Sequence, residues 1–551
     1  MMNDRLKRAP LFFWVFCLAG VAACGGGGGG GNSAPSANDG SVQDPPANQE
    51  GDGSQVRFAD TTRVLGLDYF IDNTSPGDEA TDVSGGLALD DIDNDGSLEL
   101  YVAHGRDVKG RLFSFDGTSF LELEDNNGIQ PLEMDRAGYF IDLDADGWKD
   151  FISIQDESVE VFMNDQTGQF QEATADTNLF HQRSTFSMAA ADIDLDGDVD
   201  LFFSHWDGIF DSSDVLTEYL WQNDGTGVFT DISDRVAITE EPAATVAGFV
   251  LELSYTPTFA DIDNDGYPDM LLASDGGFSQ VLRNEAGLQF TDATVRSVIT
   301  DTNGMGGTVA DYDHDGDLDW FVTSIHNLET SGEGTITGNR LYRNVDGLGN
   351  FDDVTDVAGV RNGDWGWGGC FADFDNDGHP DLFHTNGMPN VDERYADDPS
   401  RLFMANGDGS FRERSFSAGV THNGRGLGVV CADYNGDGRI DILIANNGQS
   451  PTVYENITEN NNHYLTIDLV GKGANPDAIG ARVTIESATR NQLQEVQLGT
   501  WYLSQGPAIL HFGLGQDDTV TAIDIRWPAP GLPTTRIENV AADQLIVVEQ
   551  P

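Results

Sequence analysis

Basic residues are scarce in this sequence, and their scarcity limits the partners that the protein can bind. Lysine and arginine together number 28, against 93 aspartates and glutamates, which gives a formal net charge of −65. Nucleic acids and anionic membranes are bound through positive surfaces, so both are excluded as electrostatic partners. Cations and basic proteins remain. Hydrophobic residues still make up 39% of the chain, so it can bury a core.

Motifs for several kinds of chemistry are also absent from the sequence. No His-x-His or His-Glu-x-x-His spacing favours a transition metal, and no nucleophile elbow provides a reactive serine. The glycine run at 25–31 follows no strand, so it is not a phosphate-binding loop. The sequence therefore contains no recognisable catalytic constellation, and we expect a protein that is not an enzyme.

Cysteine is rare, with four residues in the whole chain. Cys17 and Cys24 lie in the N-terminal export segment, which leaves Cys370 and Cys431. They precede the nearest aspartate-rich loop by three and by two residues, an offset that points them to opposite faces of their strands. We expect two small buried hydrophobic side chains there, neither a disulfide nor a metal-binding pair.

Residues 1–24 have the pattern of a bacterial lipoprotein signal peptide. Basic residues at 5–8 precede "LFFWVFCLAGVAAC", an apolar run too short for a permanent membrane-spanning helix. Its end, "VAAC", looks like a lipobox in which Cys24 is lipidated after cleavage. The alternative is an ordinary signal peptide that contains Cys24.

Residues 25–55 are rich in glycine, serine and proline and favour the lipoprotein reading, because an anchored domain needs a tether. A flexible chain of this length has an end-to-end distance of roughly 30 Å. The glycines after Cys24 resemble outer-membrane sorting. We predict an exported, lipid-anchored cell-envelope protein, in the outer membrane, that meets the membrane only through its lipid.

An acidic loop of nine residues recurs seven times between residues 91 and 441. The copies are DIDNDGSLE (91–99), DLDADGWKD (142–150), DIDLDGDVD (192–200), DIDNDGYPD (261–269), DYDHDGDLD (311–319), DFDNDGHPD (373–381) and DYNGDGRID (433–441). An aromatic marker alternates with them, at Phe58, Phe120, Phe170, Phe229, Phe290, Phe351 and Phe411. Apolar and β-branched runs around each loop indicate about four short strands per repeat.

Repeats with four strands each are typical of β-propeller blades rather than of a helical solenoid. The series opens with Phe58 and ends with the loop 433–441, so the seventh repeat lacks an outer strand that residues 56–62 could supply. That pairing would remove a free sheet edge. The sequence predicts a seven-bladed β-propeller over residues 56–457, and the alternative is an open array of hairpins.

Comparison of the seven loops indicates their chemistry. Positions 1, 5 and 6 are always Asp, Asp and Gly, and position 3 is Asp except at Asn435; position 9 is Asp except at Glu99. Position 7 varies freely, which is expected where only the main-chain carbonyl is a ligand. Oxygen ligands at 1, 3, 5, 7 and 9 around a glycine bend match a calcium loop of the EF-hand type, closed three residues early and followed by a strand.

The sequence therefore predicts up to seven structural Ca²⁺ ions. Their expected ligands are Asp91, Asp93, Asp95, Ser97, Glu99, Asp142, Asp144, Asp146, Trp148, Asp150, Asp192, Asp194, Asp196, Asp198, Asp200, Asp261, Asp263, Asp265, Tyr267, Asp269, Asp311, Asp313, Asp315, Asp317, Asp319, Asp373, Asp375, Asp377, His379, Asp381, Asp433, Asn435, Asp437, Arg439 and Asp441.

Electrostatics argue against two other interpretations of these loops, as solvated loops without a metal ion and as catalytic clusters. Two carboxylates about 4 Å apart repel by roughly 1 kcal/mol in water and by more near a protein, so seven unneutralised clusters would destabilise the fold. Calcium binding and folding should then be coupled. Catalytic carboxylates need environments that differ, and seven near-identical loops do not provide them.

The loops resemble the FG-GAP/VCBS repeats of integrin-α-type propellers, with departures at Glu99 and Asn435 in the first and seventh. This resemblance implies calcium at the hairpin between the first two strands, opposite the ligand face. Residues 458–551 contain "NHYLTIDLVGKGANPDAIGARV", "WYLSQG" and "HFGLG" and resemble the ASPIC/UnbV domain, a small all-β, sandwich-like domain. Together the two parts resemble the cartilage acidic protein family, in a bacterial lipoprotein form.

The opposite ends of the inner strands are the expected ligand face. Polar residues lie five positions after each closing acid, where they either meet water or line a site: His104, Gln155, His205, Ser274, Ser324, Asn386 and Asn446. Long connections at 206–219, 327–338 and 387–400 reach the same face. Candidate ligand residues are His104, His205, Asp364, Trp365, Trp367 and Arg425, although the two tryptophans suit packing between blades equally well.

These observations predict a non-enzymatic adhesion or interaction module that binds an unidentified protein or glycan. The alternative is a polysaccharide-active hydrolase or lyase, with its site on the propeller face opposite the calcium loops.

Overall fold

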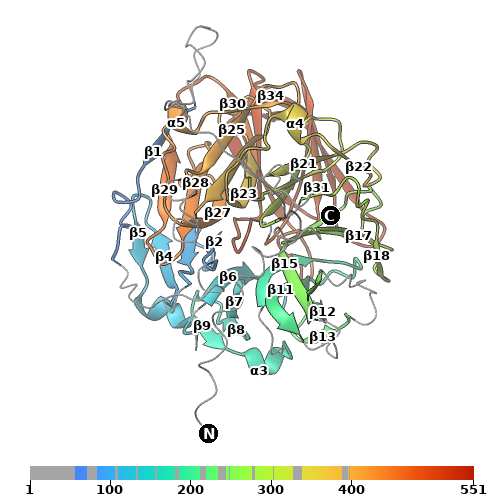
Figure 1. Cartoon of the computed structure of the whole chain (residues 1–551). Helices are drawn as coiled ribbons and strands as arrows, with labels where there is room; N and C mark the ends of the chain where they lie inside the picture. The colour runs from blue at the N-terminus through green and yellow to red at the C-terminus, as the bar shows by residue number, and fades with distance from the viewer. Residues whose placement is uncertain are drawn as a thin grey trace, which may run out of the picture. The chain divides into compact units, whose positions relative to one another are not determined.

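The fold is taken from a computed structural model of the chain (Figure 1). It describes residues 56–70, 83–105, 109–131, 135–155, 158–179, 185–233 without 211–218, 244–246, 249–275, 279–301, 303–326, 338–387, 395, 398–499 and 501–551. The predicted signal peptide, Cys24 and the tether lie outside these residues. Within the described chain, no helix is both long and apolar enough to cross a membrane.

Four-stranded antiparallel units repeat along the described part of residues 58–456, as a β-propeller requires. In chain order their strands are β2 (Leu87–Asp90), β3 (Glu99–Val102), β4 (Arg111–Phe115), β5 (Phe120–Glu122); β6 (Asp135–Ile141), β7 (Asp150–Gln155), β8 (Val159–Asn164), β9 (Phe170–Glu172); β10 (Thr185–Ala191), β11 (Asp200–Phe210), β12 (Tyr219–Asn223), β13 (Phe229–Asp231); β15 (Phe249–Ala260), β16 (Asp269–Ser274), β17 (Gln280–Asn284), β18 (Phe290–Asp292); β19 (Gly307–Ala310), β20 (Asp319–Val322), β21 (Arg340–Asn344), β22 (Phe351–Asp353); β23 (Gly366–Ala372), β24 (Asp381–Asn386), β25 (Arg401–Ala405), β26 (Phe411–Glu413); and β27 (Gly426–Ala432), β28 (Asp441–Asn446), β29 (Thr452–Asn456).

We call each unit a blade and number it by its acidic loop, which joins the first strand to the second. The third and fourth blades are linked further, because β11 pairs with β15, and β14 (Ala244–Val246) adds to β15. Short helices follow some outer strands: η2 (Glu124–Gly128), α3 (Thr174–Thr177), α4 (Thr355–Ala358) and α5 (Ser415–Ala418).

The last blade is completed by the first strand of the described chain. Strand β1 (Phe58–Asp60) pairs antiparallel with β29, and Phe58 faces Asn456 in the register. Figure 1 shows the blue β1 beside the orange β29. This pairing, predicted from the phase of the repeats, satisfies backbone groups on both strands that would otherwise form an open edge. Every outer strand begins with its marker phenylalanine.

The expectation that Cys370 and Cys431 stay unpaired is wrong. The two residues form a disulfide between β23 and β27, with their Cα atoms 6.4 Å apart. The inner strands of consecutive blades stack, so the back of one strand meets the front of the next. Side chains on opposite faces of the two strands therefore meet, and the offset that seemed to separate the cysteines brings them together.

The C-terminal residues form two facing sheets around their own core, which confirms the predicted small all-β domain. One sheet has the order β33 (Ile509–Gly515), β30 (His463–Val470), β36 (Gln544–Glu549), and the other has the order β32 (Asn491–Glu495), β31 (Arg482–Ser487), β34 (Thr519–Arg526), β35 (Thr534–Ala541). Alternating apolar residues of both sheets, with Phe512 and Trp527 at 0% exposure, fill the space between them.

A segment of this C-terminal part lies among the innermost strands of the blades. Gln505 exchanges backbone bonds with β2, donating to Leu87 O (2.8 Å) and accepting from Leu89 N (3.0 Å). Its side-chain amide bonds both Phe140 N and Phe140 O in β6, each at 2.7 Å. Leu498 O accepts a bond from β10. We call residues 496–499 and 501–507 the axial segment.

The ring of Tyr502 anchors the axial segment within the apolar centre of the blades. The residue is fully buried, and its hydroxyl donates to Val83 O at 2.8 Å. Its ring centroid lies 5.8 Å from that of Phe186 and 5.3 Å from that of Trp367. These contacts come from different blades, so the axial segment joins them through one side chain.

Replacing both cysteines, Cys370→Ala and Cys431→Ala, should destabilise the protein. The bridge closes a sequence separation of 61 residues, for which the chain-entropy model expects about 4 kcal/mol as an upper value. Denaturant unfolding without reductant measures the loss. Reductant should lower the midpoint of the native protein and leave the double variant unchanged; equal midpoints for the two proteins would contradict the bridge.

Gln505→Ala should lower the free energy of unfolding, because it leaves the buried N–H and C=O of Phe140 without these partners. An unsatisfied buried group costs about 1–3 kcal/mol. The matched control is Gln516→Ala, an exposed glutamine of the same domain whose amide bonds Asn461 O and Asn462. Equal unfolding midpoints for the two variants would show that the Gln505 side chain does not make these hydrogen bonds.

Candidate metal sites and ligand face

Each acidic loop is a tight bend whose own carboxylates hold the backbone. In all seven loops a carboxylate oxygen at position 1 accepts the N–H of the glycine at position 6, at 2.6 to 3.2 Å. The aspartate at position 5 accepts the N–H of position 7, at 2.8 to 3.1 Å. The loop is therefore preformed around its acids.

The loops need two left-handed residues, and sequence comparison identified only one of them. Glycine at position 6 has φ between +83° and +99° in the seven copies. Position 4 is also left-handed, although it is glycine only in the seventh loop; Ala145, Leu195 and His314 adopt φ near +60° there. Such backbone is strained for residues with a Cβ. Asparagine, which adopts left-handed backbone more readily than most residues, occupies position 4 in three of the seven copies. It is the signal from which the second left-handed residue could have been predicted.

Carboxylates converge inside the loops, and several of their oxygens have no partner. In each of the first five loops, three acidic residues have ligand oxygens within 4.8 Å of one another. Eight buried carboxylate oxygens of the loops accept no hydrogen bond: Asp93 Oδ1, Glu99 Oε1, Asp142 Oδ1, Asp194 Oδ1, Asp261 Oδ1, Asp311 Oδ1, Asp313 Oδ1 and Asp441 Oδ2. A hard cation bound by oxygen would satisfy them.

Burial and mutual repulsion disfavour the charged form of these acids when no cation is bound. Burial, with repulsion from nearby loop aspartates, raises the pKa of Asp150 and of Asp192 to about 8. The same causes hold the pKa of Asp381 well above its usual range. A divalent cation reverses this balance, because an opposite charge favours the ionised carboxylate.

In three loops the side chain at position 7 points away from the carboxylate cluster. Asp198, Asp317 and His379 each lie against a glycine in the turn that follows the third strand of the same blade. This placement fits the prediction that only the carbonyl of position 7 is available as a ligand, and it explains why many residue types occur there.

Arginines neutralise part of several clusters, those of the fifth and seventh loops among them. Arg343 lies 2.7 Å from a carboxylate oxygen of Asp313 and 2.7 Å from one of Asp315, in the fifth loop. In the seventh loop Arg439, at position 7, pairs with Asp437. A guanidinium competes with a metal ion for the same oxygens, so these two loops differ electrostatically from the second and third.

A repeated hydrogen bond joins each of five loops to the following blade. An asparagine that ends the third strand of one blade donates to the position-2 carbonyl of the preceding loop, at 2.8 to 3.0 Å; the donors are Asn164, Asn223, Asn284, Asn344 and Asn456. The other two loops have tyrosine at position 2, where Tyr312 stacks on Phe411 and Tyr434 packs edge-on against Phe115. Aromatic packing thus replaces the asparagine bond.

The C-terminal domain contacts the acidic loops directly. Arg482 donates to Asp261 O and Asn264 Oδ1, and Arg526 pairs with the Asp261 carboxylate. Buried Glu495 accepts the N–H of Asp261 at 3.1 Å and pairs with Arg482 at 2.9 Å.

The sixth loop is held by the same domain through neutral hydrogen-bonding groups and the nearby Arg490. His511 Nε2 lies 2.7 Å from Asn376 Oδ1, and Asn462 donates to Asp375 O at 2.8 Å. Sequence reasoning found neither of these docking contacts, because they join residues more than 80 positions apart.

The polar residues expected on the opposite face are buried. All seven, from His104 to Asn446, are at most 5% exposed. His104 Nε2 lies 2.8 Å from the Tyr69 hydroxyl, and Asn386 donates to Gly363 O at 2.8 Å. His104 Nδ1 also lies 3.2 Å from Lys109 O, so His104 and Asn386 find partners inside the protein rather than in water. His104 and His205, each at 0% exposure, are part of the interior.

The two candidate tryptophans pack together. Trp367 is 1% exposed and stacks on Trp365 with ring centroids 6.2 Å apart. Trp365 in turn meets Tyr395 edge-on at 5.2 Å. Trp367 also touches Tyr502, which makes it a packing residue. Arg425 is half-buried, and its carbonyl accepts the N–H of Asn447. The expected long connections at 206–219, 327–338 and 387–400 lie mostly outside the described residues.

Asp364 lies in a carboxyl pair that sequence reasoning did not identify. It has left-handed backbone (φ +56°), pairs with Arg401 and shares a hydrogen bond with Asp398. Asp398 accepts bonds from Trp365 N and Asn386 Nδ2, each at 2.9 Å. Burial, then repulsion from Asp364, raises the pKa of Asp398 to about 8. Burial also acts on Asp364, but Arg401 outweighs it and lowers its pKa.

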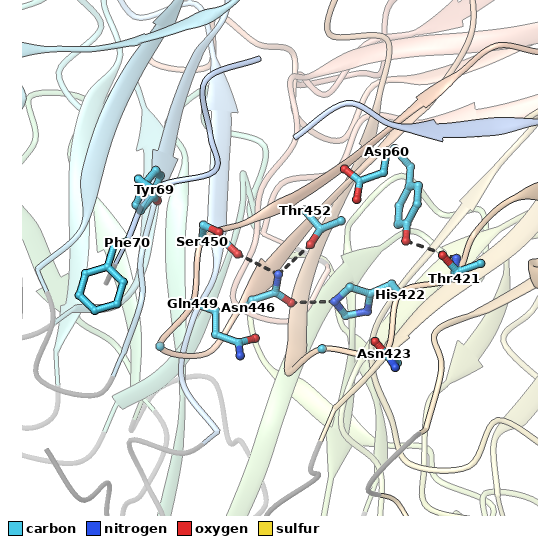
Figure 2. A pocket seen from close by; sticks show the side chains of 13 residues that line it. Asp60, Tyr69, Phe70, Thr421, His422, Asn423, Asn446, Gln449, Ser450 and Thr452 are labelled. Atoms are coloured by element: carbon cyan, nitrogen blue, oxygen red, sulfur yellow. Dashed lines mark hydrogen bonds between the residues drawn. The ribbon is translucent and has the colours of Figure 1, made fainter. Parts of the chain in front are cut away.

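A polar pocket of about 500 Å³ opens where the N-terminal strand completes the seventh blade (Figure 2). Asn446, Gln449 and Thr452 of that blade line it, with Asp60 of β1 and Phe70 from the stretch that follows. Asn446 ends the strand that begins at the acidic loop residue Asp441, so the pocket lies at the end of β28 away from the loop.

Comparisons with known proteins agree with both parts of the chain. Residues 142–203, 261–322 and 394–478 match the FG-GAP-like repeat, and residues 471–551 match the ASPIC and UnbV domain. Human cartilage acidic protein 1 is 23% identical over 509 residues, which covers 85% of this chain and 71% of that protein. The Xenopus tropicalis protein of the same name is 22% identical over 555 residues, covering 89% and 76%.

Several solved structures are also similar. An Agrocybe aegerita lectin that recognises non-reducing terminal N-acetylglucosamine is 16% identical, covers 68% of this chain and 90% of its own, and has a TM-score of 0.39. The BP39L lectin of Burkholderia pseudomallei is 11% identical, with coverage of 69% and 97% and a TM-score of 0.43. The chain is a protein of FG-GAP-like repeats followed by an ASPIC and UnbV domain, similar to cartilage acidic protein 1 over most of its length.

Proposed function

We propose that the acidic loops bind structural Ca²⁺ and that occupancy stabilises the blades. This proposal rests on the eight buried carboxylate oxygens that accept no hydrogen bond. Six of the seven loops contain at least one of them. The loops offer oxygen ligands alone, which favours calcium over zinc or copper. Among the described residues, no arginine pairs with the carboxylates of the second and third loops, so these loops should bind calcium most readily.

Calcium should raise the thermal midpoint of the protein relative to EDTA. One site adds about 1.4 kcal/mol when free calcium is ten times its Kd, and several sites add more. Asp200→Asn keeps the shape of a position-9 ligand and removes its charge. It should therefore reduce both the number of bound calcium ions and the rise in thermal midpoint that calcium causes. Scanning calorimetry and calcium titration measure both quantities.

The matched control is Asp176→Asn, an exposed aspartate outside the loops that should leave stoichiometry and shift unchanged. Magnesium in place of calcium tests the ion, since it prefers a rigid octahedral set with several waters. Coincident melting curves in calcium and in EDTA would contradict the proposal.

The protein's role is that of a non-enzymatic adhesion or interaction module that binds a protein or glycan. The FG-GAP-like repeats support an extracellular or exported location, and the N-terminal pattern supports a lipid anchor in the cell envelope. The calcium loops give the blades rigidity, and the C-terminal domain covers several of them. The strand ends away from the loops are therefore the binding face.

A second function, hydrolysis or elimination on a polysaccharide, is favoured by the Asp364–Asp398 pair. Two adjacent carboxyl groups whose pKa values are pushed apart are suited to act as base and acid. Asp364, with its side chain 31% exposed, would be the ionised member, and buried Asp398 the protonated one. The left-handed backbone of Asp364 adds the local strain that functional sites often contain.

Immobilised full-length protein should retain an envelope protein or glycan in millimolar calcium, release it in EDTA, and recover it when calcium returns. Retention of the partner that does not depend on calcium would contradict the proposed interaction role. Incubation of the purified protein with a polysaccharide panel should release no product. Turnover that disappears in Asp398→Asn and persists in the exposed-site variant Asp408→Asn would establish the enzyme instead.

A further inference from the structure

The pocket of Figure 2 has a floor whose polar groups are already fixed. Asn446 Nδ2 donates to Ser450 O and to Thr452 Oγ1, each at 2.9 Å, and its Oδ1 lies 2.8 Å from His422 Nε2. The other ring nitrogen of His422 lies 2.9 Å from Ser400 Oγ. This network is buried, so its side chains keep one geometry and a ligand meets a preorganised surface.

Side chains with amide groups stand at the edge of the pocket. Figure 2 shows Gln449 and Asn423 on either side of the Asn446–His422 pair. Both residues are exposed, and an amide offers both donors and acceptors. Asp60 adds an exposed carboxylate, one oxygen of which accepts Thr62 N at 3.0 Å. Ligand hydroxyl groups, which both donate and accept, match this set.

An exposed aromatic ring completes the pocket. Phe70 is 85% exposed, which is unusual for so large an apolar side chain. The residue before it is firmly held: Tyr69 stacks on Phe113 at 5.6 Å, bonds His104 at 2.8 Å, and has Arg111 4.4 Å above its ring. Phe70 is thus presented from a fixed position, as a platform for the apolar face of a ligand.

The charge of the lining excludes anionic ligands. No lysine or arginine lines the pocket among the described residues. His422 is neutral at ordinary pH, because burial lowers its pKa to about 4. A phosphate, sulfate or uronic acid would therefore meet only Asp60, which repels it. The ligand must be neutral or cationic.

We propose that this pocket binds a neutral sugar residue of a glycan, with its ring stacked on Phe70 and its hydroxyls bonded by Asn423, Gln449 and Asp60. A basic side chain of a protein also suits Asp60 and Phe70, but it leaves the exposed amides of Asn423 and Gln449 without ligand partners. This assignment rests on the proposed binding role of the opposite face and names its ligand class. Trp365 and Trp367 are not part of this pocket.

Titration of full-length protein, in millimolar calcium, with neutral tetrasaccharides of glucose, mannose or N-acetylglucosamine tests the proposal. At least one should bind. Phe70→Ala, and separately the double change Asn423→Ala and Gln449→Ala, should weaken that binding by about tenfold or more, which corresponds to about 1.4 kcal/mol. The matched control is Phe416→Ala, a phenylalanine that is 84% exposed on another blade and should leave affinity unchanged.

Each outcome is informative because the variants lie at the surface, and equal melting temperatures verify their folding. No binding of any neutral saccharide, or equal binding by the native protein and the pocket variants, would overturn the assignment. So would preferential binding of a lysine- or arginine-rich peptide that Asp60→Asn abolishes. Calcium-dependent retention of an envelope partner that survives the pocket variants would leave the interaction role intact and remove only this site.

Discussion

Repulsion between carboxylates is the physical constraint on which this structure depends. The acidic loops bring ligand oxygens within 4.8 Å of one another, and several of these oxygens are buried without a hydrogen bond. Backbone N–H groups at positions 2, 6 and 7 stabilise part of the charge. Arg482 and Arg526 of the C-terminal domain reach the fourth loop as well. The buried oxygens that are left without a partner are where the proposed cation would bind, so blade stability and domain docking would share one electrostatic balance with metal binding.

The same arrangement makes the two ends of the inner hairpins different. One end of the inner hairpins is held by the acidic loops, the asparagine bonds between blades and the C-terminal domain. The axial segment then fills the centre with Gln505 and the ring of Tyr502. At the other strand ends lie the polar pocket and the Asp364–Asp398 pair. The proposed ligand-binding face is therefore the end of the strands away from the acidic loops.

Sequence reasoning succeeded where a pattern repeats and failed where contacts are long-range. The loops, the four strands per repeat and the β1–β29 pairing followed from spacing and phase. The Cys370–Cys431 bridge did not, because strand periodicity describes one sheet and the bridge joins two stacked sheets. The polar strand ends from His104 to Asn446 were expected in water or at a site, and they are buried by contacts that cannot be located from local sequence.

The sequence alone determined the all-β class, the acidic loops and their oxygen chemistry, because each depends on residues a few positions apart. Only the tertiary structure decided which faces remain accessible. The axial segment lies hundreds of residues from β2, yet Gln505 bonds its backbone. Phe70 and Asn446 line one pocket because β1 closes the last blade. Such contacts depend on how whole sheets stack and close, and no local pattern encodes that arrangement.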